Sequence, residues 1–292
     1  MKLKDNNNIF CTISAGYSSV LMGVKLKEWF PNHNIIYAMA NTSKEREESL
    51  HFMNECDKYF GLNMVWIEAK INQEKRKGTD FNIVTYENLK RNGELFEDGI
   101  KKYGIPCKFN KWCNRELKLV PLKKYADSVF GKNTYSIAVG LRADEMDRVL
   151  LSYKDNNVFY PLLDKGVNTR DRNKFWKHQP IKLNLPAYKG NCDFCFEKSI
   201  RKLMTIANED KHLIKWWGEM ECKYSTTSLD GKDTYNKYID KFNRISFFRD
   251  NRTVKDIEVL ATKPFSKATD EYIYENDLFD LEGDCGAGCK VF

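Results

Sequence analysis

The sequence has no apolar run close to the roughly 20 residues that a membrane-spanning helix needs. Its N-terminal residues, MKLKDNNN, also lack the apolar stretch of a secretory signal peptide. We find no internal repeat, no low-complexity tract and no obvious interdomain linker. These absences argue against a membrane-embedded or secreted protein. We therefore expect a soluble, cytoplasmic protein without a membrane partner.

The length and charge of the chain leave several kinds of partner open. The chain has 292 residues, which suits one large domain or one domain with a smaller one appended. Its 48 Lys and Arg residues against 41 Asp and Glu residues give a formal net charge of +7. This surplus fits an anionic partner such as sulfate, a nucleotide or a nucleic acid, but it is too small to select one of them.

Nine cysteines are many for such a protein. Their odd number, without a secretion signal, argues against a disulfide framework, so metal binding or thiol chemistry is the better expectation. Cys11, Cys56 and Cys222 lie outside the motifs described below, and we interpret them as structural residues.

Residues 8–22, NIFCTISAGYSSVLM, combine a β-prone run, a loop of small residues and an amphipathic run. This order predicts a strand, a tight loop and a helix. The hydroxyl groups of Ser18 and Ser19 and the N–H groups that begin the helix would then face an anion such as phosphate. The alternative is that Ser14 and Ser18 only cap the helix after an ordinary turn.

The chain up to residue 67 predicts a βαβαβ unit. A helix over 17–30 precedes an apolar strand over 35–40, and a second helix from residue 44 to Gly61 precedes a third strand over 63–67. A continuous apolar strand is typical of a parallel sheet covered on both faces. Ligands of such sheets bind beyond the carboxyl ends of the strands, so residues 14–19 and 41–45 should share one rim.

The remaining chain is less regular. Residues 70–104 predict a peripheral excursion with a helix over 86–96, and further buried strands are expected over 135–139 and 158–163. The segment 140–148, GLRADEMDR, leaves the carboxyl end of the first of these strands and brings charged groups to the rim. A helix over 169–178 and a mainly helical C-terminal part follow. We expect a nucleotide-binding domain over 1–165 and a helical region over 166–292.

Several segments, in this order, resemble motifs of the phosphoadenosine phosphosulfate reductase family, which belongs to the PP-loop (N-type) ATP pyrophosphatases. The resemblance covers about residues 8 to 205 and is most similar to phage-type members. An ordered set of short motifs is more specific than any one of them. The matching segments are SAGYSS at 14–19 (family SGGxxS), ANTSKE at 40–45 (NTGKE), WCNRELK at 112–118 (WCTRELK), GLRADE at 140–145 (GIRADE) and GNCDFC at 190–195 (GNCxxC).

The resemblance implies an α/β fold with a Rossmann-like (adenine nucleotide alpha hydrolase-like), parallel five-stranded sheet. It also implies one of two chemistries. In the first, which we expect, ATP is cleaved between its α and β phosphates to adenylylate an acceptor, so that sulfur can displace AMP. In the second, phosphoadenosine phosphosulfate or adenosine phosphosulfate is attacked by a cysteine. Magnesium is a candidate companion of ATP, and a nucleic-acid acceptor, a sulfur donor protein and a second copy of the chain are candidate partners.

The resemblance also implies roles for individual residues. Residues that would contact the phosphate or sulfate, or lie near the nucleoside, are Ser14, Gly16, Tyr17, Ser18, Ser19, Asn41, Thr42, Arg115 and Gly140. Residues that would neutralise charge at the cleaved bond are Lys118, Arg142 and Arg148. The alternative for these cations is a salt-bridged rim, with Glu116 and Glu145 as partners.

The sequence departs from the family motifs in three places. Ala15 replaces a glycine of the loop, Tyr17 stands where Lys or Arg is frequent, and Ser43 replaces the glycine of NTG. The first two changes motivate a further alternative, a nucleotide-binding protein without catalytic activity.

Cys192 and Cys195 have the CxxC spacing of metal ligands, which needs further thiolates to complete a site. By resemblance, Cys113 is a third ligand, and Cys107 or a cysteine of the tail could be the fourth. A [4Fe–4S] cluster is the preferred expectation, zinc is the alternative, and reduced buried thiols without metal are a third interpretation. The tail segment Asp284-Cys285-Gly286 resembles the ECG of sulfonucleotide reductases, so Cys285 is a candidate catalytic nucleophile for the reductase alternative.

Aromatic residues in the basic C-terminal part favour a nucleic-acid acceptor, because rings and cations together can hold bases and phosphates. The ordinary alternative is that they form a hydrophobic core. The residues concerned are Trp216, Trp217, Tyr224, Tyr235 and Tyr238.

Overall fold

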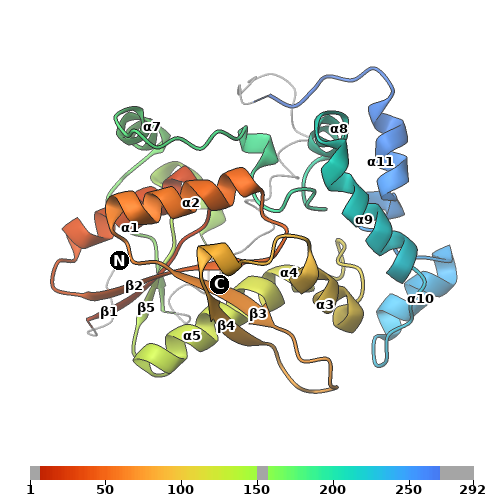
Figure 1. Cartoon of the computed structure of the whole chain (residues 1–292), viewed down its shortest axis with the longest axis horizontal. Helices are drawn as coiled ribbons and strands as arrows, with labels where there is room; N and C mark the ends of the chain where they lie inside the picture. Colours follow the sequence, from red (N-terminus) through yellow and green to blue (C-terminus); the bar gives the residue numbers. More distant parts are fainter. Residues whose placement is uncertain (1–6, 150–156, 270–292) are drawn as a thin grey trace.

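The computed structural model describes residues 7–149 and 157–269. A twisted β-sheet lies between helices, and a group of helices from the C-terminal part stands at one side of it (Figure 1). No helix in these two ranges is long and apolar enough to cross a membrane.

The sheet has six strands in the order β4-β3-β2-β1-β5-β6. All neighbouring pairs are parallel except β3 and β4, which are antiparallel. The α/β class and the mostly parallel sheet are as expected, whereas the expected number of strands was five. The strands are β1 Asn8–Thr12, β2 Asn34–Asn41, β3 Val65–Lys70, β4 Asp80–Val84, β5 Ser136–Ala138 and β6 Val158–Phe159.

Three local predictions were wrong. The extra strand β4 is a largely exposed edge strand, so its sequence carries no buried apolar run. The helix expected over 86–96 is divided into a 3-10 turn, Tyr86–Asn88, and helix α3, Glu94–Tyr103, because Gly93 has a left-handed φ of 88°. The strand expected over 158–163 ends at Phe159, and Pro161 begins the short helix α6, Pro161–Asp164.

Helices cover both faces of the sheet (Figure 1). One face carries α1, Tyr17–Trp29, and α2, Glu47–Phe60, with α7, Thr169–Lys177, packed against α1. The opposite face carries α5, Val120–Phe130. A single turn of helix, α4 (Trp112–Asn114), and a π-helical turn, η2 (Arg115–Leu119), lead directly into α5. Such π turns shift side chains relative to a regular helix and are frequent at functional sites.

In the described residues after 199, the helices α8 to α11 share a core with the region around α3 and α4. The buried rings of Phe96 and Trp112 belong to the same cluster as Trp217 and Phe247. The helix α7 follows residue 165 but packs against α1, and the domain boundary near residue 165 stays a prediction. The helices are α8 Ile200–Glu209, α9 Lys211–Tyr224, α10 Asp233–Phe242 and α11 Val254–Ala261, and the short 3-10 turns are η3 Ala143–Arg148, η4 Ala187–Lys189 and η5 Arg249–Asn251.

Candidate functional site

The sheet order places a topological switch point between β1 and β5. From β1 the chain continues through α1 to β2 on one side, whereas β5 lies on the other side and continues to β6. In open α/β sheets, loops diverge at such a point and leave a crevice beyond the carboxyl ends of the strands. The predicted phosphate loop follows β1 and the GLRADE segment follows β5. The two loops therefore border the same crevice.

The loop after β1 is braced from within. The Ser14 backbone N–H donates a hydrogen bond to Ser19 Oγ at 2.9 Å, and this bond closes the loop over the start of α1. The N-cap position is held by Gly16, in an extended conformation with φ −124° and ψ 145°. Ser14 and Ser18 are therefore not the N-cap of α1. Because glycine has no side chain to cap the helix, no side chain accepts a hydrogen bond from the first backbone N–H groups of α1, and a bound anion could accept hydrogen bonds from them.

Arg142 connects the loop after β5 to the loop after β1. Its Nη1 donates to Ser18 Oγ at 2.7 Å, and the guanidinium also pairs with Asp144 and Glu145 at 3.0 and 3.1 Å. The predicted cation therefore lies at the predicted loop, held by a network of acids. Arg148 pairs with the other oxygen of Glu145. Two of the predicted anion-binding cations are thus balanced by carboxylates, as the salt-bridged alternative supposed.

Gly140 is required by close packing. A Cβ atom at this position would lie 2.9 Å from Ser19 Cα and 3.3 Å from the Ser19 backbone nitrogen. Only glycine lets the loop after β5 approach the start of α1 this closely. Gly140 therefore lets the two loops come together, and its role in cofactor binding stays a prediction.

The side chain of Tyr17 belongs to the core. Its ring lies 4.6 Å from that of Trp176 and 5.5 Å from that of Phe52, measured between centroids. Its hydroxyl oxygen accepts a hydrogen bond from the Leu183 backbone N–H at 2.9 Å. Tyr17, which stands where the resembling motif often has Lys or Arg, therefore presents no charge to the crevice.

The loop after β2 is buried and internally bonded. The Asn41 side chain is fully buried, donates to Glu68 Oε1 at 2.7 Å and to the Lys90 carbonyl at 2.8 Å, and accepts from the Ser43 backbone N–H at 3.0 Å. Thr42 Oγ1 donates to Glu45 at 3.0 Å. These bonds use the polar groups that the resemblance assigned to the nucleoside.

Ser43 has a left-handed φ of 63°, a conformation that favours glycine. It stands where the resembling motif has a glycine. Its hydroxyl oxygen accepts from the Leu95 backbone N–H at 3.0 Å, which holds the start of α3 against the loop.

Two ion pairs join this loop to the other predicted motifs. Lys118, on the π turn, lies 3.2 Å from Glu45. Lys44 lies 2.8 Å from Asp193, between the two cysteines of the CxxC motif, and both side chains are buried. Asp193 also accepts from Trp217 Nε1 at 2.8 Å, and Lys44 Nζ lies 4.6 Å from the centroid of the Trp216 ring. Segments 40–45, 112–118 and 190–195 therefore meet in space.

Arg115 points into solvent, with 71% of its side chain exposed, and its Nε donates to Glu116 at 2.7 Å. Glu116 is buried and accepts from the hydroxyl groups of Thr79 and Tyr103. The pair Arg115 and Glu116 thus anchors the π turn against the strand β4 region. It does not bring Arg115 into contact with the phosphate loop.

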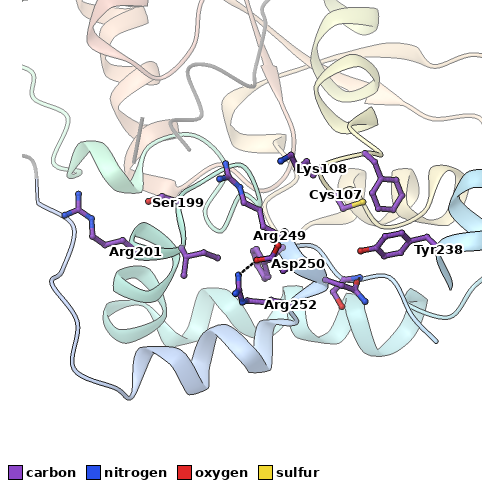
Figure 2. A pocket seen from close by; sticks show the side chains of 13 residues that line it. Cys107, Lys108, Ser199, Arg201, Tyr238, Arg249, Asp250 and Arg252 are labelled. Atoms are coloured by element: carbon purple, nitrogen blue, oxygen red, sulfur yellow. Dashed lines mark hydrogen bonds and ion pairs between the residues drawn. The ribbon is translucent and has the colours of Figure 1, made fainter. Parts of the chain in front are cut away.

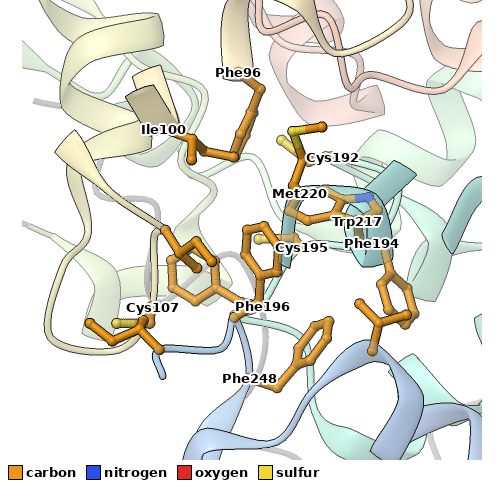
Figure 3. Close-up of a cluster of buried hydrophobic side chains, with 14 of the residues drawn as sticks. Phe96, Ile100, Cys107, Cys192, Phe194, Cys195, Phe196, Trp217, Met220 and Phe248 are labelled. Carbon is orange, nitrogen blue, oxygen red and sulfur yellow. The ribbon is translucent and has the colours of Figure 1, made fainter. Parts of the chain in front are cut away.

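The candidate metal ligands lie in or beside one hydrophobic cluster (Figure 3). Cys107, Cys192 and Cys195 are buried, and Cys113 is partly buried against the cluster. Cys192 Sγ lies 3.6 Å from Thr42 Oγ1. Burial raises the pKa of the Cys107 thiol to about 11, so it is protonated at neutral pH.

This arrangement does not by itself form a metal site. Within residues 7–149 and 157–269, no three His, Cys, Asp or Glu side chains converge closely enough to hold a metal ion. The iron-sulfur or zinc site stays a prediction, and we derive no reaction step through it. Cys285 and Cys289 lie outside the described residues.

The most important contact that sequence reasoning missed is the pair Lys44 and Asp193. Both residues stand inside quoted motifs, in ANTSKE and GNCDFC, so their presence there was a usable signal. The residue after Lys44, Glu45, pairs with Lys118 at 3.2 Å, so neighbouring residues of one motif have partners in two different segments. The buried aspartate that links the CxxC loop to α9 was not anticipated.

All five candidate aromatic residues of the C-terminal part lie in or against one hydrophobic core, as the ordinary alternative supposed, and their role in binding nucleic acid stays a prediction. Trp217 and Tyr235 are core residues, and the Tyr235 hydroxyl accepts from the Ile105 backbone N–H. Trp216 and Tyr224 pack against the same core, and Tyr224 donates to Glu97 at 2.7 Å. Tyr238 lines a cavity that is described below.

Comparisons with known proteins give relatives without an assigned activity. The chain is 24% identical over 262 residues to the uncharacterized nin region protein ORF290 of Escherichia phage lambda, covering 89% of this chain and 86% of that protein. It is 33% identical over 95 residues to the uncharacterized protein MJ0973 of Methanocaldococcus jannaschii, or 30% of this chain and 21% of that protein. A second protein of that organism, MJ0066, is 26% identical over 105 residues, which cover 36% of this chain and 17% of that protein. No protein-family model and no solved structure matches the chain.

Proposed function

We propose that the crevice at the carboxyl ends of β1 and β5 binds an adenine nucleotide, and that the protein uses ATP to activate an acceptor for sulfur transfer. The observation that carries this proposal is the 2.7 Å contact between Arg142 and Ser18. It brings a cation to the N-terminus of α1 at the switch point of the sheet. Backbone N–H groups at a helix start together with a guanidinium form a common phosphate site.

The chemistry follows from the resemblance. An acceptor oxygen attacks the α-phosphorus of ATP, a new P–O bond forms, and pyrophosphate leaves with the electrons of the broken bond. A sulfur nucleophile of the hydrosulfide class, delivered by a donor protein, then attacks the activated carbon. The C–O bond breaks and AMP leaves. The carbon keeps its oxidation state, so the two steps require no electron donor.

The described residues support the binding part of this scheme. Arg142 is the cation best placed for the phosphates because it already contacts the loop, and its carboxylate partners hold its orientation. Lys118 and Arg148 are paired with Glu45 and Glu145, and a bound polyphosphate would compete with these acids. Positive charge near the bond that breaks stabilises the developing pyrophosphate.

Calorimetric titration of the full chain with ATP tests the binding. We expect saturable binding in the wild-type protein and a loss of about tenfold or more in affinity for Arg142→Gln, since a charge-assisted contact to phosphate is removed. Arg76→Gln is the matched control, because Arg76 is exposed in the segment between β3 and β4. Absence of binding by the wild-type protein, or equal affinity in Arg142→Gln, would contradict the proposed site.

The activation step needs a second measurement. Release of AMP and pyrophosphate from ATP is measured with candidate acceptors and hydrosulfide, and sulfite release is measured from adenosine phosphosulfate. AMP together with pyrophosphate supports the proposal. Sulfite release, or tight ATP binding without any product, contradicts the activation step and favours the reductase or the non-catalytic alternative.

A further inference from the structure

A cavity of about 920 Å³ lies in the C-terminal region, away from the residues of the crevice (Figure 2). It is bordered by the segment before α4, the start of α8, one side of α10 and the turn η5. Its lining residues are Cys107, Lys108, Phe109, Ser199, Ile200, Arg201, Tyr238, Ser246, Phe248, Arg249, Asp250, Asn251 and Arg252.

The lining of the cavity carries a surplus of positive charge. It contributes four cations and one carboxylate, Asp250, which pairs with Arg252 at 2.7 Å. The side chains of Lys108 and Arg249 extend to the same side of the cavity in Figure 2. A cavity lined in this way attracts anions more strongly than the modest net charge of the whole chain suggests.

A row of three aromatic rings continues from the cavity across α10, in which the partly buried Tyr238 lies between two exposed rings, Phe109 and Phe242. The Phe109 ring lies 4.6 Å from that of Tyr238, which lies 4.5 Å from that of Phe242. Phe109 is 47% exposed and Phe242 is 42% exposed. Large apolar rings that face water in a row beside cations are available for stacking.

A buried polar group in the lining is also left without a hydrogen-bond partner. Ser246 is only 2% exposed, and its Oγ has no partner within the part of the chain that the structure describes. Buried hydroxyl groups are normally satisfied, so an unpartnered hydroxyl in a cavity wall indicates a ligand or water that completes the bond.

We propose that this cavity and the ring row bind a single-stranded segment of nucleic acid. Phosphates would contact Lys108 and Arg249, and bases would stack on the exposed rings Phe109 and Phe242. A basic groove with aromatic platforms is the usual design of such sites. A free phosphate or a mononucleotide would leave the ring row unused, and an acidic peptide would not stack on it.

This inference deepens the proposed function by naming nucleic acid as the acceptor class. The binding itself does not depend on ATP chemistry. Cys107 lines the cavity and belongs to the buried cluster that contains Cys192, and Cys192 contacts Thr42 after β2. The cavity and the rim of the sheet therefore adjoin one cysteine-containing cluster from different sides.

Fluorescence anisotropy with labelled oligothymidylate and oligouridylate of about 12 nucleotides, a length within the usual site size of single-strand binders, tests the proposal on the full chain. We expect Phe109→Ala to weaken binding about tenfold and Phe109→Tyr to preserve it, because tyrosine retains the stacking face. We expect Lys108→Glu to weaken binding and to reduce its salt dependence. Lys132→Glu, an equally exposed change between α5 and β5, should have no effect.

The proposal would be overturned by no binding of the wild-type protein at low salt, by equal binding of Phe109→Ala, or by an equal effect of Lys108→Glu and Lys132→Glu. Polyphosphate that competes as well as the oligonucleotide would likewise show a site for anions alone. Titration of each variant with ATP separates this failure from failure of the proposed function, since the cavity variants should bind ATP like the wild-type protein.

Discussion

Two loops that leave neighbouring parallel strands differ in what they do with their polar groups. The loop after β2 is buried, and its side chains bond to each other and to distant segments, as in Asn41 with Glu68 and Lys44 with Asp193. The loop after β1 has two internal hydrogen bonds, from the Ser14 N–H to Ser19 Oγ and from the Gly16 N–H to the Ser14 carbonyl, and its Gly16 leaves the start of α1 without a side-chain cap.

The difference indicates that the two loops at the rim of the sheet have different functions, one structural and one in ligand binding. A ligand gains little from polar groups that are already bonded, because each new bond replaces an old one. Donors that face the crevice without an internal partner are worth more to an anion. We infer that the loop after β2 holds the C-terminal region in place, and that the loop after β1 is the binding element.

We expect the largest loss of stability from a substitution that breaks the buried ion pair between Lys44 and Asp193. Asp193→Asn leaves Lys44 charged and buried without its counterion, and removal of one member of such a pair typically costs about 3–5 kcal/mol of unfolding free energy. Urea denaturation measures this loss. The matched control is Asp230→Asn, which removes an exposed pair with Lys75 and should cost less than about 1 kcal/mol. If the two variants lost similar amounts of unfolding free energy, the buried pair would not stabilise the loop after β2 more than an exposed ion pair does.

A buried acid without a close cation should behave differently from Asp193. Glu221, on α9, accepts from the backbone N–H groups of Phe247 and Val254, yet burial raises its pKa to about 7. The folded state therefore holds its proton more tightly than the unfolded state. Between about pH 4.5 and 7, the free energy of unfolding should fall as pH rises, by an amount on the order of 3 kcal/mol.

Urea midpoints measured from pH 5 to 7.5 test this sign. The fall in stability with rising pH should be smaller in Glu221→Gln, which has no titrating group, than in the wild-type protein. Glu219→Gln changes an exposed neighbour and should keep the wild-type slope. If stability depended on pH in Glu221→Gln as it does in the wild-type protein, the raised pKa of Glu221 would not contribute to the pH dependence of stability.

Gly140→Ala should displace the loop after β1, because Gly140 lies in the loop after β5 and packs against Ser19. The added Cβ would meet the backbone of Ser19 at 2.9 Å, and overpacking of this kind costs about 1–3 kcal/mol. Because the start of α1 must move, ATP affinity should fall together with stability. Gly218→Ala is the control, since a Cβ there meets only ordinary contacts with Val254 at 3.8 Å or more. Unchanged ATP affinity in Gly140→Ala would argue against a rigid loop as the binding element.

Much of this rim could be predicted from the sequence, and for a clear reason. A continuous apolar strand such as β2 predicts a parallel sheet. In a parallel sheet, the carboxyl ends of strands that are distant in sequence lie at the same edge. The position of residues 14–19 and the approach of Arg142 follow from that rule. The exposed edge strand β4 could not be predicted in the same way, because it has no buried face to leave a pattern.

Contacts between side chains that are distant in sequence are a second feature that the sequence does not predict. Nothing in the sequence selects Asp193 as the partner of Lys44 from 41 acidic residues, since the choice depends on how the C-terminal helices pack on α3 and α4. The cavity has the same origin. Lys108 and Arg249 become neighbours only after the helices are in place.

We expect the smallest change in stability from substitutions of Ser43, which contributes to the loop after β2 through its backbone conformation and through its hydroxyl group. Its left-handed φ of 63° disfavours any side chain, whereas its hydroxyl accepts from the Leu95 N–H and donates to the Thr42 carbonyl. Ser43→Gly relieves the backbone and loses both bonds, so the net change should lie within about 1 kcal/mol of zero. Ser43→Ala loses both bonds and keeps the backbone cost, so it should be about 1 kcal/mol less stable than Ser43→Gly. Urea denaturation of the two variants measures the difference. If alanine were tolerated as well as glycine, backbone conformation would not explain why the resembling motif has glycine at this position.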